Sequence, residues 1–266
     1  MLTTALTIAG FDGSGGAGLQ ADLKTFSALG CYGMNVLTAL PIQNTCGVRN
    51  CFNLPLAAIE EQLDAIFSDI TPNVIKIGML FNQEIVHLVA EFLSQHAQNI
   101  PIVLDPVMVA KSGDYLLLPE AIETLKRELI PQVTLITPNI NEAQALTNME
   151  IKTPSDMLKN AEIIHTLGNV NILLKGGHLD GISCDDLLFT SSAQHWFKAP
   201  RIETINTHGT GCTLSAAIAA NLAQGQDLVS SCQNAKDYLY QAMLSFKDVT
   251  IGHGHGPVNH FHQWWS

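Results

Sequence analysis

The stretch 206–218, which reads NTHGTGCTLSAAI, holds the residues of this sequence best suited to chemistry. Gly209, Thr210 and Gly211 favour neither helix nor strand, and the apolar spacing after them predicts a helix from about Cys212 to Leu222. A helix N-terminus has unpaired backbone N–H groups and a partial positive charge, so it attracts anions. Because glycine has no side chain, an anion can approach the backbone closely here. The stretch therefore predicts an anion-binding turn.

Cys212 falls in the first turn of this predicted helix. The field at a helix N-terminus favours a thiolate, which predicts a lowered pKa and a group able to take a proton. The alternative is an N-capped helix that carries a buried, inert cysteine. Both interpretations are open from these residues alone.

A second group of polar residues follows two predicted strands. Asn139 and Glu142 come after Val133–Ile136, and their spacing places both on one face of a helical turn. Asp105 follows the strand Ile102–Leu104 at another strand end. Amide and carboxylate oxygens can hold Mg²⁺ through its waters. We therefore expect a magnesium site that uses Glu142 and Asp105.

Residues 13–18, Gly-Ser-Gly-Gly-Ala-Gly, fit the dinucleotide pattern G-x-G-x-x-G. That fingerprint also needs an acidic residue about 20 positions later to hold a ribose. No Asp or Glu lies between Asp22 and Glu60. A P-loop needs Gly-Lys-Ser/Thr, whereas Gly15 is followed by glycine and alanine. The sequence therefore favours neither nucleotide-binding motif.

The C-terminal segment carries two His-x-His pairs, at His253 and His255 and at His260 and His262. Zinc ligands are often histidines, but these pairs lack the helical H-E-x-x-H spacing and have no nearby cysteine. We expect structural packing or a solvated tail, with a metal site as the alternative.

Bulk composition narrows the class of protein. The 266 residues are 47% hydrophobic and 14% charged, which is enough for a sizeable core and too little charge for disorder. The formal net charge of -11 argues against non-specific nucleic-acid binding, which needs a basic surface. No apolar run is long enough to span a membrane. The six cysteines form no C-x-x-C pair and, without a signal peptide, indicate reduced thiols in the cytoplasm.

Short apolar runs alternate with helical apolar patterns along most of the chain. These strands and helices determine where the polar residues named above lie. The expected strands are Ala5–Ala9, Val36–Leu40, Val74–Ile77, Ile102–Leu104, Val133–Ile136 and Ile172–Leu174, followed by a hairpin of Leu187–Phe189 and His195–Phe197. The pattern predicts an α/β fold whose mostly parallel sheet has helices on both faces, in a single domain over 1–266. Ligands bind outside the carboxyl ends of such strands, so the polar residues after them should share one edge.

Seven stretches, spread over nearly the whole chain, are informative together. They are SGGAGLQADLKTFSALG (14–30), TALPIQNTCGV (38–48), KIGML (76–80), DPVMVAKSGDYLL (105–117), LITPNINEA (135–143), LLKGGHL (173–179) and NTHGTGCTLSAA (206–217). With them the chain resembles phosphomethylpyrimidine kinases of the ribokinase-like superfamily. The resemblance implies a three-layer ribokinase-like fold, usually a homodimer. It also implies ATP-dependent phosphorylation of 4-amino-5-hydroxymethyl-2-methylpyrimidine, then of its monophosphate, for thiamine synthesis.

The resemblance implies roles for individual residues. The anion hole for the transferring phosphoryl group would be Gly209, Thr210, Gly211 and Cys212. Cys212 takes the position that an aspartate base holds in sugar-kinase relatives. The N-x-x-E motif that organises Mg²⁺ and phosphate would be Asn139 and Glu142.

The same resemblance places the two substrates. The expected pyrimidine pocket consists of Gly10, Asp22, Gln43, Met79 and Val107. Lys175 is expected near the nucleotide phosphates, and Lys111 near the incoming phosphate or on a lid. Phe11 and Gly13 depart from the family pattern in the loop beside this pocket.

Other functions compete with this one. A non-catalytic pyrimidine-binding protein on a kinase fold is one alternative, although Cys212, Glu142 and the glycine turn together favour an enzyme. Within the enzymes, a pyridoxine or pyridoxal kinase is the alternative. How far Cys212 acts as a base is also open, because the backbone N–H groups of 209–212 could carry most of the stabilisation of a loose phosphoryl-transfer transition state.

Overall fold

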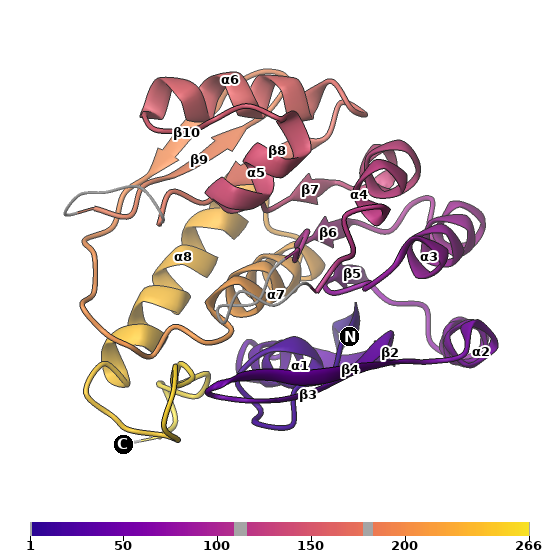
Figure 1. Ribbon diagram of the computed structural model, residues 1–266, viewed down its shortest axis with the longest axis horizontal. Coiled ribbons are helices and arrows are strands. Elements are labelled where there is room, and N and C mark those ends of the chain that lie inside the picture. Colours follow the sequence, from indigo (N-terminus) through magenta and orange to yellow (C-terminus); the bar gives the residue numbers. More distant parts are fainter. Residues whose placement is uncertain (1, 109–115, 178–182, 266) are drawn as a thin grey trace.

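The computed structural model describes residues 2–108, 116–177 and 183–265. Within these ranges one eight-stranded sheet forms the centre of the molecule, in the order β10-β9-β8-β7-β6-β5-β1-β2 (Figure 1). Its strands are β1 (Thr4–Ala9), β2 (Tyr32–Leu37), β5 (Val74–Ile77), β6 (Ile102–Leu104), β7 (Leu135–Ile136), β8 (Asn171–Leu174), β9 (Asp186–Phe189) and β10 (Gln194–Phe197). Within this sheet β2, β1, β5, β6, β7 and β8 are parallel to one another, and β9 runs antiparallel to both of its neighbours. The predicted mostly parallel sheet is thus confirmed.

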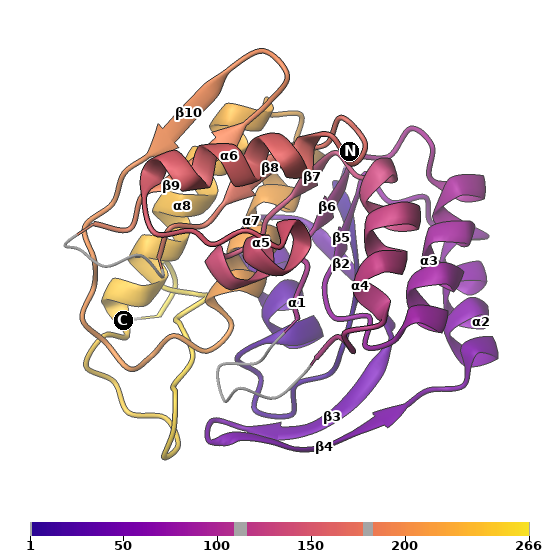
Figure 2. The ribbon, with the colours of Figure 1, turned by 45° about the horizontal axis from the view of Figure 1, so that its top comes forward.

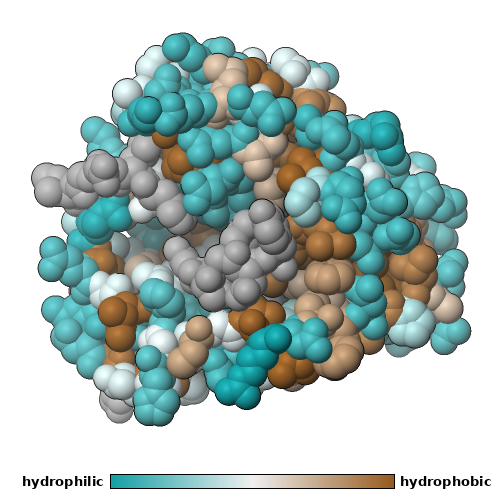
Figure 3. Space-filling view, in the orientation of Figure 1, coloured by the Kyte–Doolittle hydropathy of each residue, from teal (hydrophilic) through white to brown (hydrophobic). Residues whose placement is uncertain are grey.

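Helices cover both faces of the sheet, and each face has its own hydrophobic core. One core lies under α2 (Leu56–Phe67), α3 (Gln83–His96), α4 (Ala121–Thr124), α5 (Ile140–Thr147) and α6 (Pro154–His165). The other lies under α1 (Gly18–Ala28), α7 (Thr210–Ala223) and α8 (Leu228–Ser245). Apolar residues alternate along the strands and therefore feed both cores, as expected for a sheet buried on two sides. On the face seen in Figure 3, hydrophobic side chains gather mainly on the side of α2 and α3.

One predicted helix is only partly α-helical. Helical spacing from Pro119 to Leu129 predicts a continuous helix, but α4 is followed by a π-helical turn, η1 (Leu125–Leu129), and a 3-10 turn, η2 (Ile130–Gln132). Pro131 lies within η2 and has no backbone N–H to continue an α-helical ladder. The apolar stripe is still buried, through Leu125 and Leu129.

The expected strand Val36–Leu40 is in fact two strands. The first, β2, ends at Leu37, and β3 (Ala39–Asn44) then leaves the main sheet and pairs with β4 (Gly47–Asn53) as a separate two-stranded hairpin. Thr38 marks the break, since its buried hydroxyl donates to the Met79 carbonyl at 2.6 Å. Figure 2 shows the hairpin extending below the sheet, away from the helical layers.

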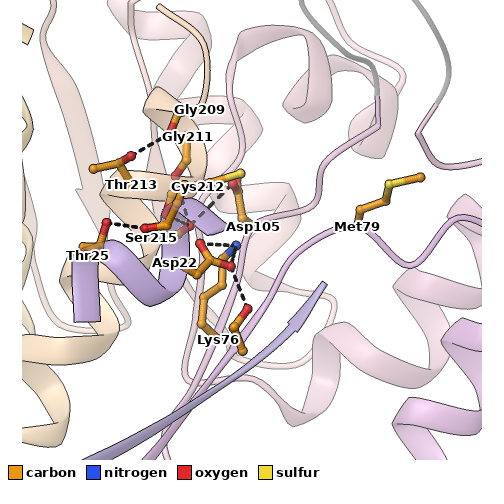
Figure 4. Close-up of polar contacts among 12 residues, drawn as sticks. Asp22, Thr25, Lys76, Met79, Asp105, Gly209, Gly211, Cys212, Thr213 and Ser215 are labelled. Carbon is orange, nitrogen blue, oxygen red and sulfur yellow. Dashed lines mark hydrogen bonds and ion pairs between the residues drawn. The ribbon is translucent and has the colours of Figure 1, made fainter. Parts of the chain in front are cut away.

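The carboxyl ends of the parallel strands meet at one edge, as the alternating pattern predicts. Gly10 follows β1, Asp105 follows β6, and a backbone bridge joins Asn139 after β7 to Lys175 after β8. The N-terminus of α7 lies beside the same edge, where it faces the end of β6 (Figure 4).

A buried ion pair lies beneath this edge. The Lys76 Nζ atom of β5 is 2.8 Å from Asp22 Oδ2 of α1, and both side chains are fully buried. Thr7 of β1 donates a third bond to this carboxylate at 2.6 Å. Burial alone would lower the pKa of Lys76, but the adjacent Asp22 carboxylate raises it. The pair therefore joins α1 to the middle of the sheet, and each buried charge is stabilised by the other.

Removing one member of this pair should be more harmful than neutralising both. Lys76→Met should lower the free energy of unfolding by about 3–5 kcal/mol, because it leaves Asp22 buried without a counter-charge. Adding Asp22→Asn should restore part of that loss, since the amide oxygen still accepts from Thr7 and no charge remains. Urea unfolding of both variants measures the effect. A single variant as stable as the wild type, or a double variant less stable than the single one, would contradict this account.

Candidate active site

A cavity of about 980 Å³ opens at the carboxyl edge of the sheet, between the β3–β4 hairpin and the helical layer of α7 and α8. Twelve of the residues singled out in the sequence line this cavity together: Gly10, Gln43, Met79, Asp105, Val107, Asn139, Glu142, Lys175, Gly209, Thr210, Gly211 and Cys212. They come from seven separate segments of the chain. The cavity is large enough for two small ligands side by side.

One of the expected residues is placed differently. Asp22 does not line the cavity: it is fully buried and turned toward Lys76, which itself reaches the cavity wall (Figure 4). The correction has an electrostatic cause, since a carboxylate on the buried face of α1 needs the lysine as a partner. Lys111 lies outside the described residues.

The turn before α7 has the geometry that its glycines predict. Gly209 adopts the left-handed conformation, with φ of 77°, and a Cβ atom built on it would lie 1.8 Å from the Gly16 carbonyl oxygen. Only glycine fits this close approach. A Cβ atom on Gly211 would lie 3.3 Å from Asp105 Oδ2 and 3.4 Å from Lys175 Nζ. The start of α7 therefore lies directly beside these two charged side chains.

The Cys212 thiol differs from its expected state. Burial raises its pKa to about 11, and the Asp22 and Asp105 carboxylates add to this effect while Lys76 opposes it. The predicted lowering of the pKa was wrong, because desolvation of the half-buried thiol outweighs the field of the helix N-terminus. Figure 4 shows the thiol above the Asp22–Lys76 pair and close to Asp105.

Three charged side chains form the cavity wall beside this turn. Lys175 Nζ lies 2.9 Å from Asp105 Oδ1 and 4.0 Å from Glu142 Oε2. Burial alone would lower the pKa of Lys175, but these two carboxylates raise it. Thr137 donates to Asp105 at 3.3 Å and holds that carboxylate at the end of β6. The ammonium group thus bridges two carboxylates at the cavity wall.

Asn139 and Glu142 also have a local structural role. The Asn139 side chain accepts from the Glu142 N–H at 2.9 Å, and Glu142 accepts from the Asn139 N–H at 2.7 Å, which is a capping box at the start of α5. Burial raises the Glu142 pKa to about 7, although Lys175 opposes the rise. One oxygen of each residue is therefore used by the cap.

The donor set at this wall fits Mg²⁺ only as part of a larger shell. Asp105 and Glu142 offer hard carboxylate oxygens, which suit this ion. Among the described residues no cluster of three or more His, Cys, Asp or Glu could hold a metal by itself. The remaining ligands would have to be waters and phosphate oxygens, as is usual for Mg²⁺ in phosphoryl transfer.

The Gln43 side chain lines the cavity, and one of the two polar groups of its amide is already hydrogen-bonded within the protein. Its amide nitrogen donates to the Phe11 carbonyl at 3.0 Å. Its oxygen is then the atom suited to accept from an exocyclic amine. Phe11, which departs from the family pattern, also lines the cavity.

Sequence reasoning missed a pair that joins the glycine loop to the α7 turn. Asp12 is fully buried, and its Oδ2 atom lies 2.8 Å from His208 Nε2. It also accepts from the N–H groups of Ser14, Gly16 and Ala17 at 2.7–3.0 Å. Burial alone would raise the Asp12 pKa, but His208 and these bonds lower it to about 2. An Asp followed by Gly-Ser was a turn signal, whereas its histidine partner lies far away in the sequence.

The far end of the cavity was also missed. It is bounded by residues 199–204 and by side chains of α8, including Leu239, Tyr240 and Met243. Lys236 of α8 lies 2.5 Å from Asp186 Oδ2, whose other oxygen accepts from the Gly176 N–H at 2.9 Å. A lysine on the buried face of a helix was the available signal for this pair.

Comparisons with known proteins agree with the geometry. The profile of the family described as phosphomethylpyrimidine kinase matches residues 12–259. The hydroxymethylpyrimidine/phosphomethylpyrimidine kinase of Escherichia coli (strain K12) is 51% identical over 263 residues, which are 98% of each chain. The protein of the same name from Rhizobium meliloti (strain 1021) is 47% identical over 267 residues, with both chains fully covered.

Solved structures share the fold. Phosphomethylpyrimidine kinase from Clostridium difficile 630 has a TM-score of 0.80 at 44% identity, and the match covers 91% of this chain and 99% of that one. Pyridoxal kinase from Staphylococcus aureus, in complex with AMP-PCP and pyridoxal, has a TM-score of 0.90 at 34% identity over 99% of this chain and 95% of that one. The ribokinase-like fold is thus confirmed. With a profile match over most of its length and close relatives over nearly all of it, the chain belongs to the phosphomethylpyrimidine kinase family.

Proposed function

We propose that this protein transfers the γ-phosphoryl group of ATP to the hydroxymethyl group of 4-amino-5-hydroxymethyl-2-methylpyrimidine. It then phosphorylates the monophosphate again, which yields the diphosphate used for thiamine. The observation that carries the proposal is the opening of the Gly209–Cys212 turn onto Asp105 and Lys175, inside the same cavity as Gln43. Phosphoryl transfer needs an anion hole, a cation and a positioned hydroxyl in one water-poor site.

The two substrates take opposite ends of the cavity. The pyrimidine lies between Gln43, Met79 and Val107, with its exocyclic amine toward the Gln43 oxygen. The adenosine lies at the end formed by residues 199–204 and α8, where Leu239 and Met243 offer apolar surface. The phosphates then fall between Lys175 and the α7 turn.

Stabilisation of the transferring group comes first from the backbone. The first-turn N–H groups of α7 and the positive end of its dipole would stabilise the charge that spreads over the phosphoryl oxygens, whereas the Thr210 N–H donates to the Thr207 carbonyl at 3.4 Å. Lys175 supplies a formal positive charge on the other side. Asp105 and Glu142 would hold Mg²⁺ together with the phosphates, and the ion would supply positive charge that neutralises them.

Cys212 takes the hydroxyl proton. Its raised pKa keeps it a neutral thiol at pH 7. Bond formation to the acceptor is weak in a loose transition state, so the proton leaves late. The thiolate that accepts it is then a minor but strongly basic form.

The assembly and its location follow the family expectation. We propose a homodimeric, cytoplasmic enzyme whose residues 1–266 form one kinase domain. Tyr32 on the edge strand β2, and Ile42 and Phe52 on the hairpin, are large hydrophobic side chains exposed by 41–53%, and they provide apolar surface for a second copy. No helix in the described part of the chain is long and apolar enough to cross a membrane.

Substrate choice is tested by ADP release. The purified protein with Mg-ATP should release ADP with the hydroxymethylpyrimidine and with its monophosphate, each with a much higher kcat/KM than with pyridoxal. Pyridoxal is the informative comparison because pyridoxal kinases share the fold. A higher kcat/KM for pyridoxal would assign the other vitamin-kinase activity, and binding of the pyrimidine without ADP release would indicate a binding protein.

Glu142 should act through the metal. Glu142→Gln keeps the shape and the capping bond but removes the charge, so the apparent Mg²⁺ requirement should rise and turnover should fall. Glu123→Gln is the matched control, because Glu123 of α4 is exposed and pairs with Lys126 of η1. Magnesium titrations of ADP release measure both variants. If Glu142→Gln titrates like the control, this carboxylate has only its capping role.

Cys212 and Gly211 separate the base from the anion hole. Cys212→Ser leaves the backbone turn in place, and turnover should fall by about 10²–10⁴-fold if the thiolate is the base. Burial raises the thiol pKa to about 11, so the thiolate fraction increases as the pH rises toward that value. Wild-type kcat/KM should therefore increase from pH 7 to 10, and this slope should vanish in the variant.

Gly211→Val should be severe in either case, since its side chain enters the space beside Asp105 and Lys175. A loss under about tenfold in Cys212→Ser, with an unchanged pH profile, would leave catalysis to the backbone and the cations.

A further inference from the structure

The glycine- and histidine-rich segment 252–257, GHGHGP, contacts two parts of the active site at once. We call it the C-terminal strap. It follows α8 and reaches the tip of the β3–β4 hairpin, as Figures 1 and 2 both show. Its His255 also lines the cavity.

The strap holds the hairpin tip through Thr45. The His255 N–H donates to the Thr45 carbonyl at 2.9 Å, and the Gly254 N–H donates to the Thr45 hydroxyl at 3.2 Å. Thr45 lies two residues after Gln43, in the same wall of the cavity. The hairpin belongs to a separate sheet, so contacts of this kind determine where it lies relative to the rest of the site.

The strap also holds the turn before α7. His208 donates its N–H to the Gly256 carbonyl at 3.0 Å and forms a bridge with Pro257. The His208 ring contacts the buried Asp12 carboxylate at 2.8 Å. The next residue is Gly209, where the anion-binding turn begins. One short segment thus touches both the pyrimidine side and the phosphoryl side.

Each glycine of the strap is required by a close contact. A Cβ atom on Gly252 would lie 2.4 Å from the Thr45 hydroxyl, and one on Gly254 would lie 2.0 Å from the Thr45 carbonyl oxygen. On Gly256 it would lie 2.0 Å from Asn206 Oδ1. The alternating G-x-G-x-G spacing presents one bare edge of the strap to the hairpin and to the turn.

The strap is firmly anchored after Pro257. Val258, Asn259 and His260 are buried, and the Asn259 N–H donates to Ala242 of α8 at 3.0 Å. His260 Nε2 lies 3.1 Å from the Thr213 hydroxyl in α7. The strap therefore connects the hairpin tip to the helical layer that carries the anion-binding turn.

We infer that the strap and His208 are positioning elements that fix the distance between the pyrimidine-binding hairpin and the phosphoryl-binding turn. In-line transfer needs the acceptor oxygen about 3–3.5 Å from phosphorus, and a displacement near 1 Å can reduce the rate about 10²-fold. The inference rests on the proposed kinase function. Turnover of the wild-type protein tests that function separately.

Gly254→Ala is the first test, because its methyl group would meet a backbone oxygen that no side chain can move away. We expect pyrimidine KM to rise and kcat to fall by about 10–100-fold, with ATP KM unchanged. Gly225→Ala is the control: Gly225 has φ of 83° and no neighbour within 4 Å of an added Cβ, so it brings backbone strain without a strap contact. Its KM values should equal those of the wild type. Melting temperatures of both variants measure lost stability.

A double-mutant cycle makes the test specific. If the strap acts through the hairpin, Gly254→Ala and Gln43→Ala should be less than additive in pyrimidine kcat/KM. Thr45→Val, which keeps the shape and removes the hydroxyl acceptor, should act in the same direction if Gly254→Ala does not fold. Wild-type kinetics in the folded Gly254→Ala variant, an equal loss of ATP affinity, or full additivity with Gln43→Ala would each overturn the inference.

Discussion

The contact between Gly209 and Gly16 is the constraint on which the active-site edge depends. These residues belong to opposite ends of the chain, and a Cβ atom on Gly209 would lie 1.8 Å from the Gly16 carbonyl oxygen. The absence of a side chain lets the loop after β1 lie directly against the N-terminus of α7. The Asp12–His208 pair closes the same junction with a charge-assisted contact. Without this close approach the cavity would not be closed at the junction between the glycine loop and α7.

Buried charge determines how the rest of the site is organised. Lys76 lies in β5 and Lys175 directly follows β8, and each faces carboxylates rather than solvent. A buried ion is stable only with a partner, so each lysine fixes a carboxylate in position. The Asp22–Lys76 pair stays internal and supports α1, whereas the Asp105–Lys175 pair lies at the cavity wall. The same chemistry thus serves structure in one place and phosphate binding in the other.

Local signals in the sequence were enough for most of the fold. β5 and β6 have the predicted bounds, because short apolar runs closed by Gly78 and Asp105 have few other interpretations. The β3–β4 hairpin was not predicted, since the pattern of Val36–Leu40 runs through the break at Thr38. That break depends on a hydrogen bond to Met79, a contact between segments that no local pattern records.

The site residues divide in the same way. Residues at strand ends and in the α7 turn were predictable, because the position of a strand end depends on topology. Asp22 was misplaced and Asp12 was missed because their partners, Lys76 and His208, lie in distant segments. The C-terminal histidines were read as packing or tail residues, and the structure adds that the glycines between them make the close contacts.

Cys212 shows why a helix N-terminus cannot be judged from its field alone. The partial positive charge of α7 favours a thiolate, but the glycine loop and the strap pack against the turn that creates this field and remove part of its water. Exclusion of water strengthens every dipole aimed at a phosphoryl group and, for the same reason, penalises an unpaired thiolate. Burial that makes the turn a strong anion hole is therefore the burial that raises the thiol pKa. Base strength and anion binding at this position are two consequences of the same partial desolvation.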